Sequence, residues 1–306
     1  MSLIVSGCSS STHPKPQDLP EFPFELIRFE HVFFGDLNTP LDQLKSQYPY
    51  FFPEQTPDFV WEEKRTNSLQ QALFKATQTL FKDDLKQRTS NVLRYANHYF
   101  PNDKLPRKVI TLLTDVDYSL RAVDADSLLL ISIDTYLGES HPLYEGIPQY
   151  IKNSLVPEHL ESELIDALSN RYIQKTNSRS FLSRMVTHGK RLLIHDYLAP
   201  DLMAHQHIQY TQNQWDWAIS HESDVWRYFV DNEWLFSTDE SLRFRFLNLS
   251  PYSKFYSYLD ENSPGRIGQW IGYRMVKAYQ KRTGASLQEV LAANAQEILK
   301  KSRYNP

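Results

Sequence analysis

The first half of the chain contains the alternation of apolar and polar residues that is typical of β-strands. Residues 24–34 alternate in this way, and we expect them to form one strand. Further extended segments are expected at residues 108–114, 121–123 and 127–133. The acidic turn at residues 124–126 would join the last two of these as a hairpin.

Helical spacing of apolar residues dominates the rest of the chain. Before the second strand it predicts a short helix over residues 40–45 and two helices within residues 68–99, broken near Lys82 and Asp83. After Pro148 we expect helices at residues 158–174, 179–197, 212–236, 240–246, 267–281 and 287–300. Early strands and late helices without strict alternation predict an α+β fold that is mostly α. Since no linker divides residues 24–306, we expect one domain with a small sheet in its N-terminal half and a helical C-terminal half.

The composition is that of an ordinary globular protein and excludes several classes of function. Hydrophobic residues make up 41% of the chain and charged residues 23%, and the net charge is −4. An acidic balance argues against nucleic acid as a partner, because binding phosphates requires a basic excess. After Cys8 no apolar run reaches the length of a membrane span. The glycine-rich loops that bind nucleotides are also absent from the sequence.

The N-terminus carries the single cysteine of the chain, Cys8, which therefore cannot form an internal disulfide or a cysteine-based zinc site. Residues 5–8, Val-Ser-Gly-Cys, resemble a bacterial lipobox, in which the cysteine receives a lipid. The Ser-, Thr- and Pro-rich stretch that follows has the composition of a flexible tether. We therefore interpret residues 1–23 as a truncated signal and a tether, with a free thiol as the alternative.

Ten histidines prompt a search for a hydrolytic metal site, but their spacing does not provide one. The H-E-x-x-H pattern places two ligands and a general base on one helix face. His221 and Glu222 begin such a pattern, and Val225 stands where the second ligand would be. The sequence therefore predicts no metal site, no cofactor and no catalytic residues.

One carboxylate lies on an apolar helix face, where its charge needs a partner. Glu222 shares that face with Val225 and Phe229. Lys190, beside a mid-helix glycine that suggests close helix packing, and Arg266, before a later helix, are the candidate partners. We expect Glu222 to pair with one of these cations in a polar centre that joins three helices.

Several segments together resemble the GldB family of gliding-motility lipoproteins of Bacteroidetes. The resemblance rests on the order and spacing of ELIRFEHVFFG, YPYFFP, MVTHGKRLLIHDYLAP, QYTQNQWDWAISHESDVWRYFVDNEWLFSTD and SPGRIGQWIGYRMVKAY. It implies a lipid-anchored component of the cell envelope that faces the periplasm, at the outer membrane. Its implied partners are the membrane, through the lipid on Cys8, and other envelope proteins of the gliding and type IX secretion machinery.

A weaker resemblance links the chain to zinc peptidases of the H-E-x-x-H class, which have an early small sheet followed by active-site helices. It implies a zincin-like domain, and His188-Gly189 stands where those enzymes have Glu-Gly. Two functions stay open. The first is a non-catalytic protein that acts by protein interaction. The second is a zinc metallopeptidase with atypical ligands drawn from His159, Glu163 and His188.

Overall fold

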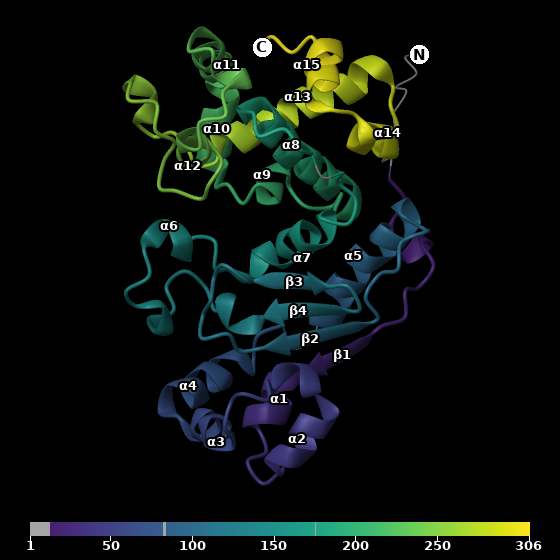
Figure 1. Ribbon diagram of the computed structural model, residues 1–306, viewed down its shortest axis with the longest axis vertical. Coiled ribbons are helices and arrows are strands. Elements are labelled where there is room, and N and C mark those ends of the chain that lie inside the picture. Colours follow the sequence, from purple (N-terminus) through teal and green to yellow (C-terminus); the bar gives the residue numbers. More distant parts are fainter. Residues whose placement is uncertain (1–12, 82–83, 175) are drawn as a thin grey trace, which may run out of the picture.

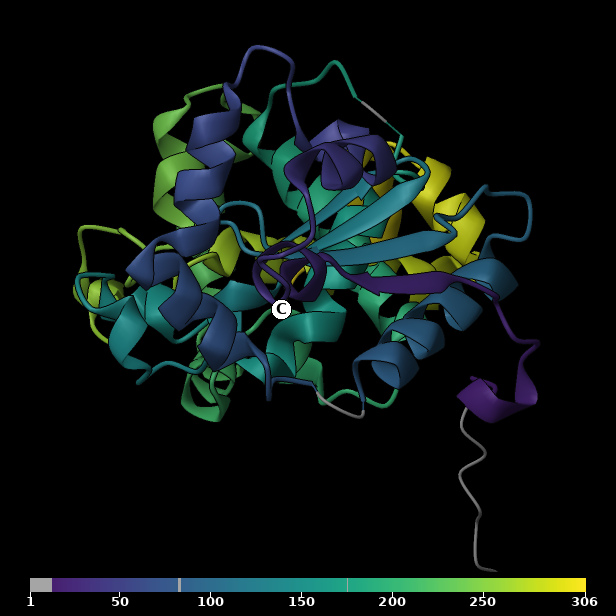
Figure 2. The ribbon, with the colours of Figure 1, turned by 90° about the horizontal axis from the view of Figure 1, so that it is seen from below.

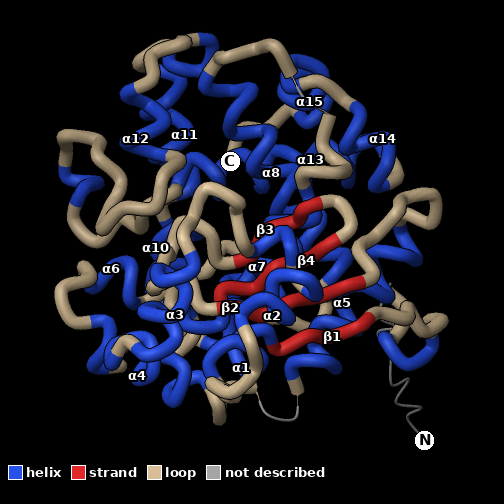
Figure 3. The backbone as a smooth tube through the Cα atoms, turned by 60° about the horizontal axis from the view of Figure 1, so that its bottom comes forward, coloured by secondary structure: helices blue, strands red, loops and turns tan. Residues whose placement is uncertain are grey.

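A small mixed sheet lies at the centre of the N-terminal half. The computed structural model describes residues 13–81, 84–174 and 176–306. Within them the strands are β1 Glu25–Arg28, β2 Lys108–Leu112, β3 Ala122–Ala125 and β4 Leu128–Ser132. Their order is β1-β2-β4-β3, and Figure 3 shows them side by side in red. The β1–β2 and β2–β4 pairs are parallel, and β3 and β4 form the antiparallel hairpin expected from the sequence.

Helices cover both faces of this sheet (Figures 1 and 2). Helices α1 to α4 lie on one face, whereas α5 and α7 lie on the other, between the sheet and the C-terminal helices. The short helix α6 lies at one end of the sheet, on a loop that follows β4. The bounds are α1 Phe29–Phe34, α2 Leu41–Gln47, α3 Asp58–Thr66, α4 Ser68–Thr77, α5 Leu85–Tyr99, α6 Gln149–Lys152 and α7 Leu160–Ser169.

Two long helices, α8 and α13, cross at the centre of the C-terminal half. Gly272 on α13 meets α8 so closely that a Cβ atom there would lie 1.9 Å from the Met185 carbonyl oxygen. A Cβ atom on Gly189 would lie 2.3 Å from the Gly272 backbone, which confirms the close approach expected at Gly189. The bounds are α8 Phe181–Leu198, α9 Ala204–His207, α10 Gln212–Ser220, α11 Glu222–Asp231, α12 Ser241–Phe246, α13 Ile267–Thr283, α14 Leu287–Ala292 and α15 Ala295–Ser302.

The sheet and the helices share one large hydrophobic core. Its buried side chains run from Leu19 to Ile298 and include Val109 and Leu129 of the sheet and Phe229 of α11. The α+β, mostly helical architecture predicted from the sequence is therefore confirmed. No helix within the described ranges combines the length and the apolar character that crossing a membrane requires.

The predicted strand over residues 24–34 is wrong in its second half. The strand ends at Arg28, and Phe29–Phe34 forms α1, which buries Phe29, Glu30, Phe33 and Phe34. In the helix the buried Glu30 carboxylate accepts a hydrogen bond from the Thr111 hydroxyl at 2.6 Å and pairs with Arg28. Folding as a helix thus buries three aromatic rings and still gives the carboxylate its partners.

Two helices predicted as continuous are each divided in the structure. At His221, between α10 and α11, the ring nitrogen Nδ1 lies 2.9 Å from the Trp217 carbonyl oxygen and donates to the end of α10. Asn294 separates α14 from α15, because its side chain accepts a hydrogen bond from the Glu297 amide and so caps the second helix. The segment predicted as 158–174 is also shorter, since α7 ends at Ser169.

Candidate functional site

Glu222 is buried as expected, but its partner is Arg274 rather than Lys190 or Arg266. The Nε atom of Arg274 donates to the Glu222 carboxylate at 2.9 Å, and the Tyr304 hydroxyl donates to the same oxygen at 2.7 Å. Burial alone would lower the pKa of Arg274, yet the hydrogen bond and charge of Glu222 outweigh it and raise that pKa. The carboxylate therefore joins α11, α13 and the C-terminal segment.

Lys190 serves a different part of the structure. Its buried ammonium donates to the Leu291 and Ala293 carbonyl oxygens at 2.8 and 2.6 Å, which satisfies the C-terminal end of α14. Burial lowers its pKa to about 8. The proposed polar centre of Lys190, Glu222 and Arg266 is thus wrong as a unit, because each of the three side chains lies at a separate place.

The alternative metal ligands are not brought together either. His159 Nδ1 lies 3.0 Å from the Ser154 carbonyl oxygen, and the Glu163 carboxylate accepts hydrogen bonds from Arg121 and Gln209. Across residues 13–81, 84–174 and 176–306, no three His, Cys, Asp or Glu side chains are grouped as a metal ion requires, so His159, Glu163 and His188 do not form such a set. Cys8, the predicted lipid attachment site, lies outside the described residues.

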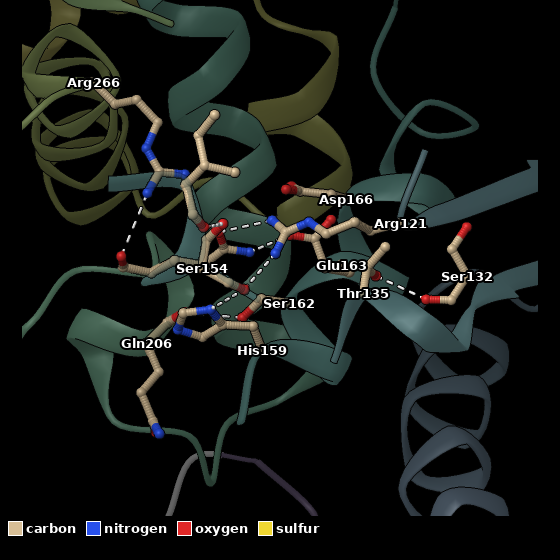
Figure 4. A network of polar contacts seen from close by, with 12 residues as sticks. Arg121, Ser132, Thr135, Ser154, His159, Ser162, Glu163, Asp166, Gln206 and Arg266 are labelled. Atoms are coloured by element: carbon tan, nitrogen blue, oxygen red, sulfur yellow. Dashed lines mark hydrogen bonds and ion pairs between the residues drawn. The ribbon is translucent and has the colours of Figure 1, made fainter. Parts of the chain in front are cut away.

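Around Glu163, a network of polar side chains connects the sheet to the C-terminal half (Figure 4). Arg121, just before β3, donates to the Ser154 carbonyl oxygen at 2.5 Å, to the Gln209 side-chain oxygen at 3.1 Å and to the Glu163 carboxylate. The Gln209 amide also donates to Glu163. The charge of Arg121 is thus neutralised by Glu163, which also holds the loop that precedes α10.

A pocket of about 410 Å³ lies beside this network, between α6 and the loops that flank α10 and α13. Its volume falls within the range of small-ligand sites. None of the described residues that form its wall is acidic. The lining residues are Gln149, Tyr150, Asn153, Ser154, His159, Gln209, Tyr210, Thr211, Gln214, Leu249, Ser250, Pro251, Gly265 and Arg266.

The cation of the pocket is Arg266, which has few interactions of its own. Its Nη2 donates to the Gln209 carbonyl oxygen at 3.4 Å, which is the dashed line drawn from it in Figure 4. Its guanidinium carbon lies 6.0 Å from the Tyr210 ring centre, and its buried Nε has no hydrogen-bond partner in the described part of the chain. Burial lowers the pKa of Arg266 and the charge of Arg121 acts in the same direction, whereas Tyr210, Asp166 and Glu163 oppose the shift without reversing it. The guanidinium is therefore held in the pocket at an electrostatic cost.

The second titratable group of the pocket, His159, is neutral at physiological pH. Burial lowers its pKa to about 4, and the charges of Arg121 and Arg266 contribute. Because a carbonyl oxygen can only accept, the contact with Ser154 places the proton of the neutral ring on Nδ1. The Nε2 atom therefore carries a lone pair, so the pocket combines a cationic donor with a neutral acceptor.

The backbone around Arg266 is in conformations that non-glycine residues adopt rarely. Arg266 and Gln209 both have left-handed torsions, with φ of 63° and 55°. Gly265, which precedes Arg266, packs tightly against the loop that contains Ser250, since a Cβ atom on this glycine would lie 2.3 Å from the Ser250 carbonyl oxygen. Left-handed residues of this kind are found preferentially at functional sites.

Sequence reasoning named Arg266 and His159 but missed the network around them. Arg121 and Gln209 lie 88 positions apart, and although Gln209 opens one of the segments that carry the family resemblance, neither segment indicates that the two side chains meet. The only local signal was the polarity of Arg121 beside a predicted strand, which does not identify its partner.

Comparison with known proteins identifies the family. The model of the family described as gliding motility protein GldB matches residues 10–306, essentially the whole chain. The chain belongs to the GldB family. The resemblance noted from the sequence is thus confirmed, and membership of the GldB family implies a part in gliding motility. Neither a curated protein nor a solved structure matches the chain, so the zincin-like relationship stays a prediction.

Proposed function

We propose that this chain is a lipid-anchored, non-catalytic component of the cell envelope that acts in gliding motility and type IX secretion by binding another envelope protein. The match to the GldB family over residues 10–306 carries the proposal. The same proposal places the protein on the periplasmic side of the outer membrane, attached through the lipid on Cys8.

The beginning of the described chain supports a short anchor. His13 packs against the domain, with its ring centre 5.1 Å from that of Tyr197. Four residues lie between Cys8 and position 13, and the five steps along an extended chain span at most about 18 Å. A lipid on Cys8 would therefore keep the folded part close to the membrane surface.

A binding role also agrees with the chemistry of the pocket. Glu163, one of the metal ligands proposed in the metallopeptidase alternative, accepts hydrogen bonds from Arg121 and Gln209, and His159 donates to the Ser154 carbonyl oxygen. What these partners leave accessible is the guanidinium of Arg266 and the hydroxyl and amide groups of the wall. Such a set recognises a ligand without requiring a reaction.

Replacing the lipid acceptor tests the proposal. In a gliding host that lacks its own copy, Cys8→Ala should leave the membrane fraction and fail to restore gliding, whereas the neighbouring Ser9→Ala should behave as wild type. Membrane attachment of Cys8→Ala at the wild-type level would contradict the anchor. Stoichiometric zinc in protein purified without chelators, lost together with a peptidase activity in His188→Ala, would contradict the non-catalytic role.

A further inference from the structure

Arg266 differs from the other buried arginines near the pocket because it lacks a carboxylate. Arg121 has Glu163, and the guanidinium of Arg88 on α5 binds Glu161. Among the described residues Arg266 forms no ion pair, its Nε has no partner, and its one hydrogen bond is long at 3.4 Å. A guanidinium has five N–H donors in a planar fork, so most of the donors of Arg266 are available to a ligand.

We propose that the pocket binds the free C-terminal carboxylate of a peptide segment of a partner protein, with Arg266 as the group that recognises it. A carboxylate matches the planar fork of a guanidinium and would supply the missing counter-charge. None of the described residues that line the pocket is acidic, and the carboxylates of Asp166 and Glu163, which act on Arg266, are not among the lining residues. The inference rests on the proposed binding role and names the chemistry of the partner.

His159 distinguishes a peptide carboxylate from an inorganic anion. Its neutral ring offers the lone pair of Nε2, which attracts an N–H donor and repels an oxygen that carries negative charge. A hydrogenphosphate dianion offers a single hydroxyl donor among charged oxygens that Nε2 would repel, whereas the last residue of a peptide carries an amide N–H next to its carboxylate. The pairing of Arg266 with a neutral histidine therefore favours a peptide end.

The walls of the pocket suit the peptide that would precede this carboxylate. Gln149, Asn153 and Gln214 present amides to a peptide backbone. Those of Gln149 and Asn153 also hydrogen-bond to each other at 2.7 Å, and the Gln214 side-chain oxygen accepts from the Thr211 amide, so their remaining donors and acceptors would contact the ligand. Tyr150, Leu249 and Pro251 provide apolar surface for a side chain. The pocket volume of about 410 Å³ is adequate for a short peptide end.

The test compares peptides that differ only at their C-terminus. A library of N-acetylated tripeptides, with free or amidated ends, is passed over the immobilised protein, and the retained peptides are identified by mass spectrometry. The dissociation constant of the best free acid is then measured by calorimetry. We expect its amide to bind at least tenfold more weakly, and we expect Arg266→Gln to remove this difference.

The matched control is Arg227→Gln, which removes the same charge from an exposed arginine of α11 whose ion pair among the described residues is with Asp224. It should bind the free acid as the wild type does. Equal affinity of the acid and the amide in the wild-type protein, or tighter binding of inorganic phosphate, would overturn the inference even if Arg266→Gln did not fold. The assay uses purified protein, so its outcome does not depend on whether Cys8→Ala impairs gliding. A failure of the peptide-binding inference can therefore be distinguished from a failure of the proposed envelope role.

Discussion

Two arginines of α13, one directly before its first residue and one at its middle, have opposite surroundings. Arg274, within α13, donates to the Glu222 carboxylate at 2.9 Å, and its side chain is still 45% exposed. Arg266, the residue that precedes α13, lines a pocket and has a single long hydrogen bond to a carbonyl oxygen. The sequence places the two cations eight positions apart with no indication of which one has the carboxylate.

The difference separates a stabilising contact from a recognition site. The Arg274–Glu222 pair connects three segments, and each of its members is satisfied within the chain. Arg266 has a left-handed backbone conformation and forms no ion pair with the described residues, although the charges of Asp166 and Glu163 act on it from a greater distance. An anionic ligand would supply a counter-charge at ion-pair distance, which the described residues do not provide.

The largest expected effect is the decrease in the free energy of unfolding that acid should cause through His159 of the pocket. The pKa of His159 is about 4 in the folded chain and 6.5 in the unfolded chain, so between these values the unfolded chain binds the extra proton. The free energy of unfolding should therefore fall as the pH falls from 6.5 to 4, and the shift corresponds to about 3 kcal/mol. His159→Gln should lose that part of the pH dependence in denaturant titrations at pH 7 and pH 4.

The control for this prediction lies next to the Arg274–Glu222 pair. His221→Gln removes a half-buried histidine that stacks on Trp217, at a ring-centre distance of 4.2 Å, beside Glu222. If both variants changed the pH dependence equally, acid sensitivity would not distinguish the pocket from the ion pair.

An intermediate effect is expected when the ion pair is broken. Glu222→Gln weakens two hydrogen bonds to a charged acceptor, and we expect a loss of about 2 kcal/mol in the free energy of unfolding, because solvent screens the half-exposed Arg274. The loss in the double variant with Arg274→Gln should be smaller than the sum of the single losses. Strict additivity in chemical denaturation would show that the two side chains do not interact in solution.

The fold could be predicted from the sequence wherever the spacing of apolar residues fitted only a strand or only a helix. The segments that became β2, β3 and β4 are short and bounded by turn residues, and α8 and α13 are long enough to show a helical stripe. The strand prediction for residues 24–34 is wrong in its second half because Phe29 and Phe33 are four positions apart, and this spacing fits both an alternating strand and one turn of a helix. There the sheet neighbours, through Thr111 and Glu30, decide the outcome.

The candidate site was only partly accessible from the sequence, for a related reason. Helical phase correctly placed Glu222 on a buried face, but it could not tell how α13 is rotated against α11, and that rotation selects Arg274 two turns beyond Arg266. The network of Arg121, Glu163 and Gln209 joins three distant segments. Contacts of that kind follow from tertiary packing rather than from local spacing.

The smallest expected effect is the change in stability of Arg266→Gln, and it decides whether Arg266 and Arg274 have different roles. Arg266→Gln removes a partly desolvated charge together with one weak hydrogen bond and a distant contact with the Tyr210 ring. These terms oppose each other, so we expect the free energy of unfolding to change by no more than about 0.5 kcal/mol. Arg274→Gln, with the same change of side chain, should lose clearly more. Equilibrium denaturation of the two variants measures both values. A loss of more than about 2 kcal/mol for Arg266→Gln would show that the fold itself depends on this cation, and the pocket would then have no group reserved for a ligand.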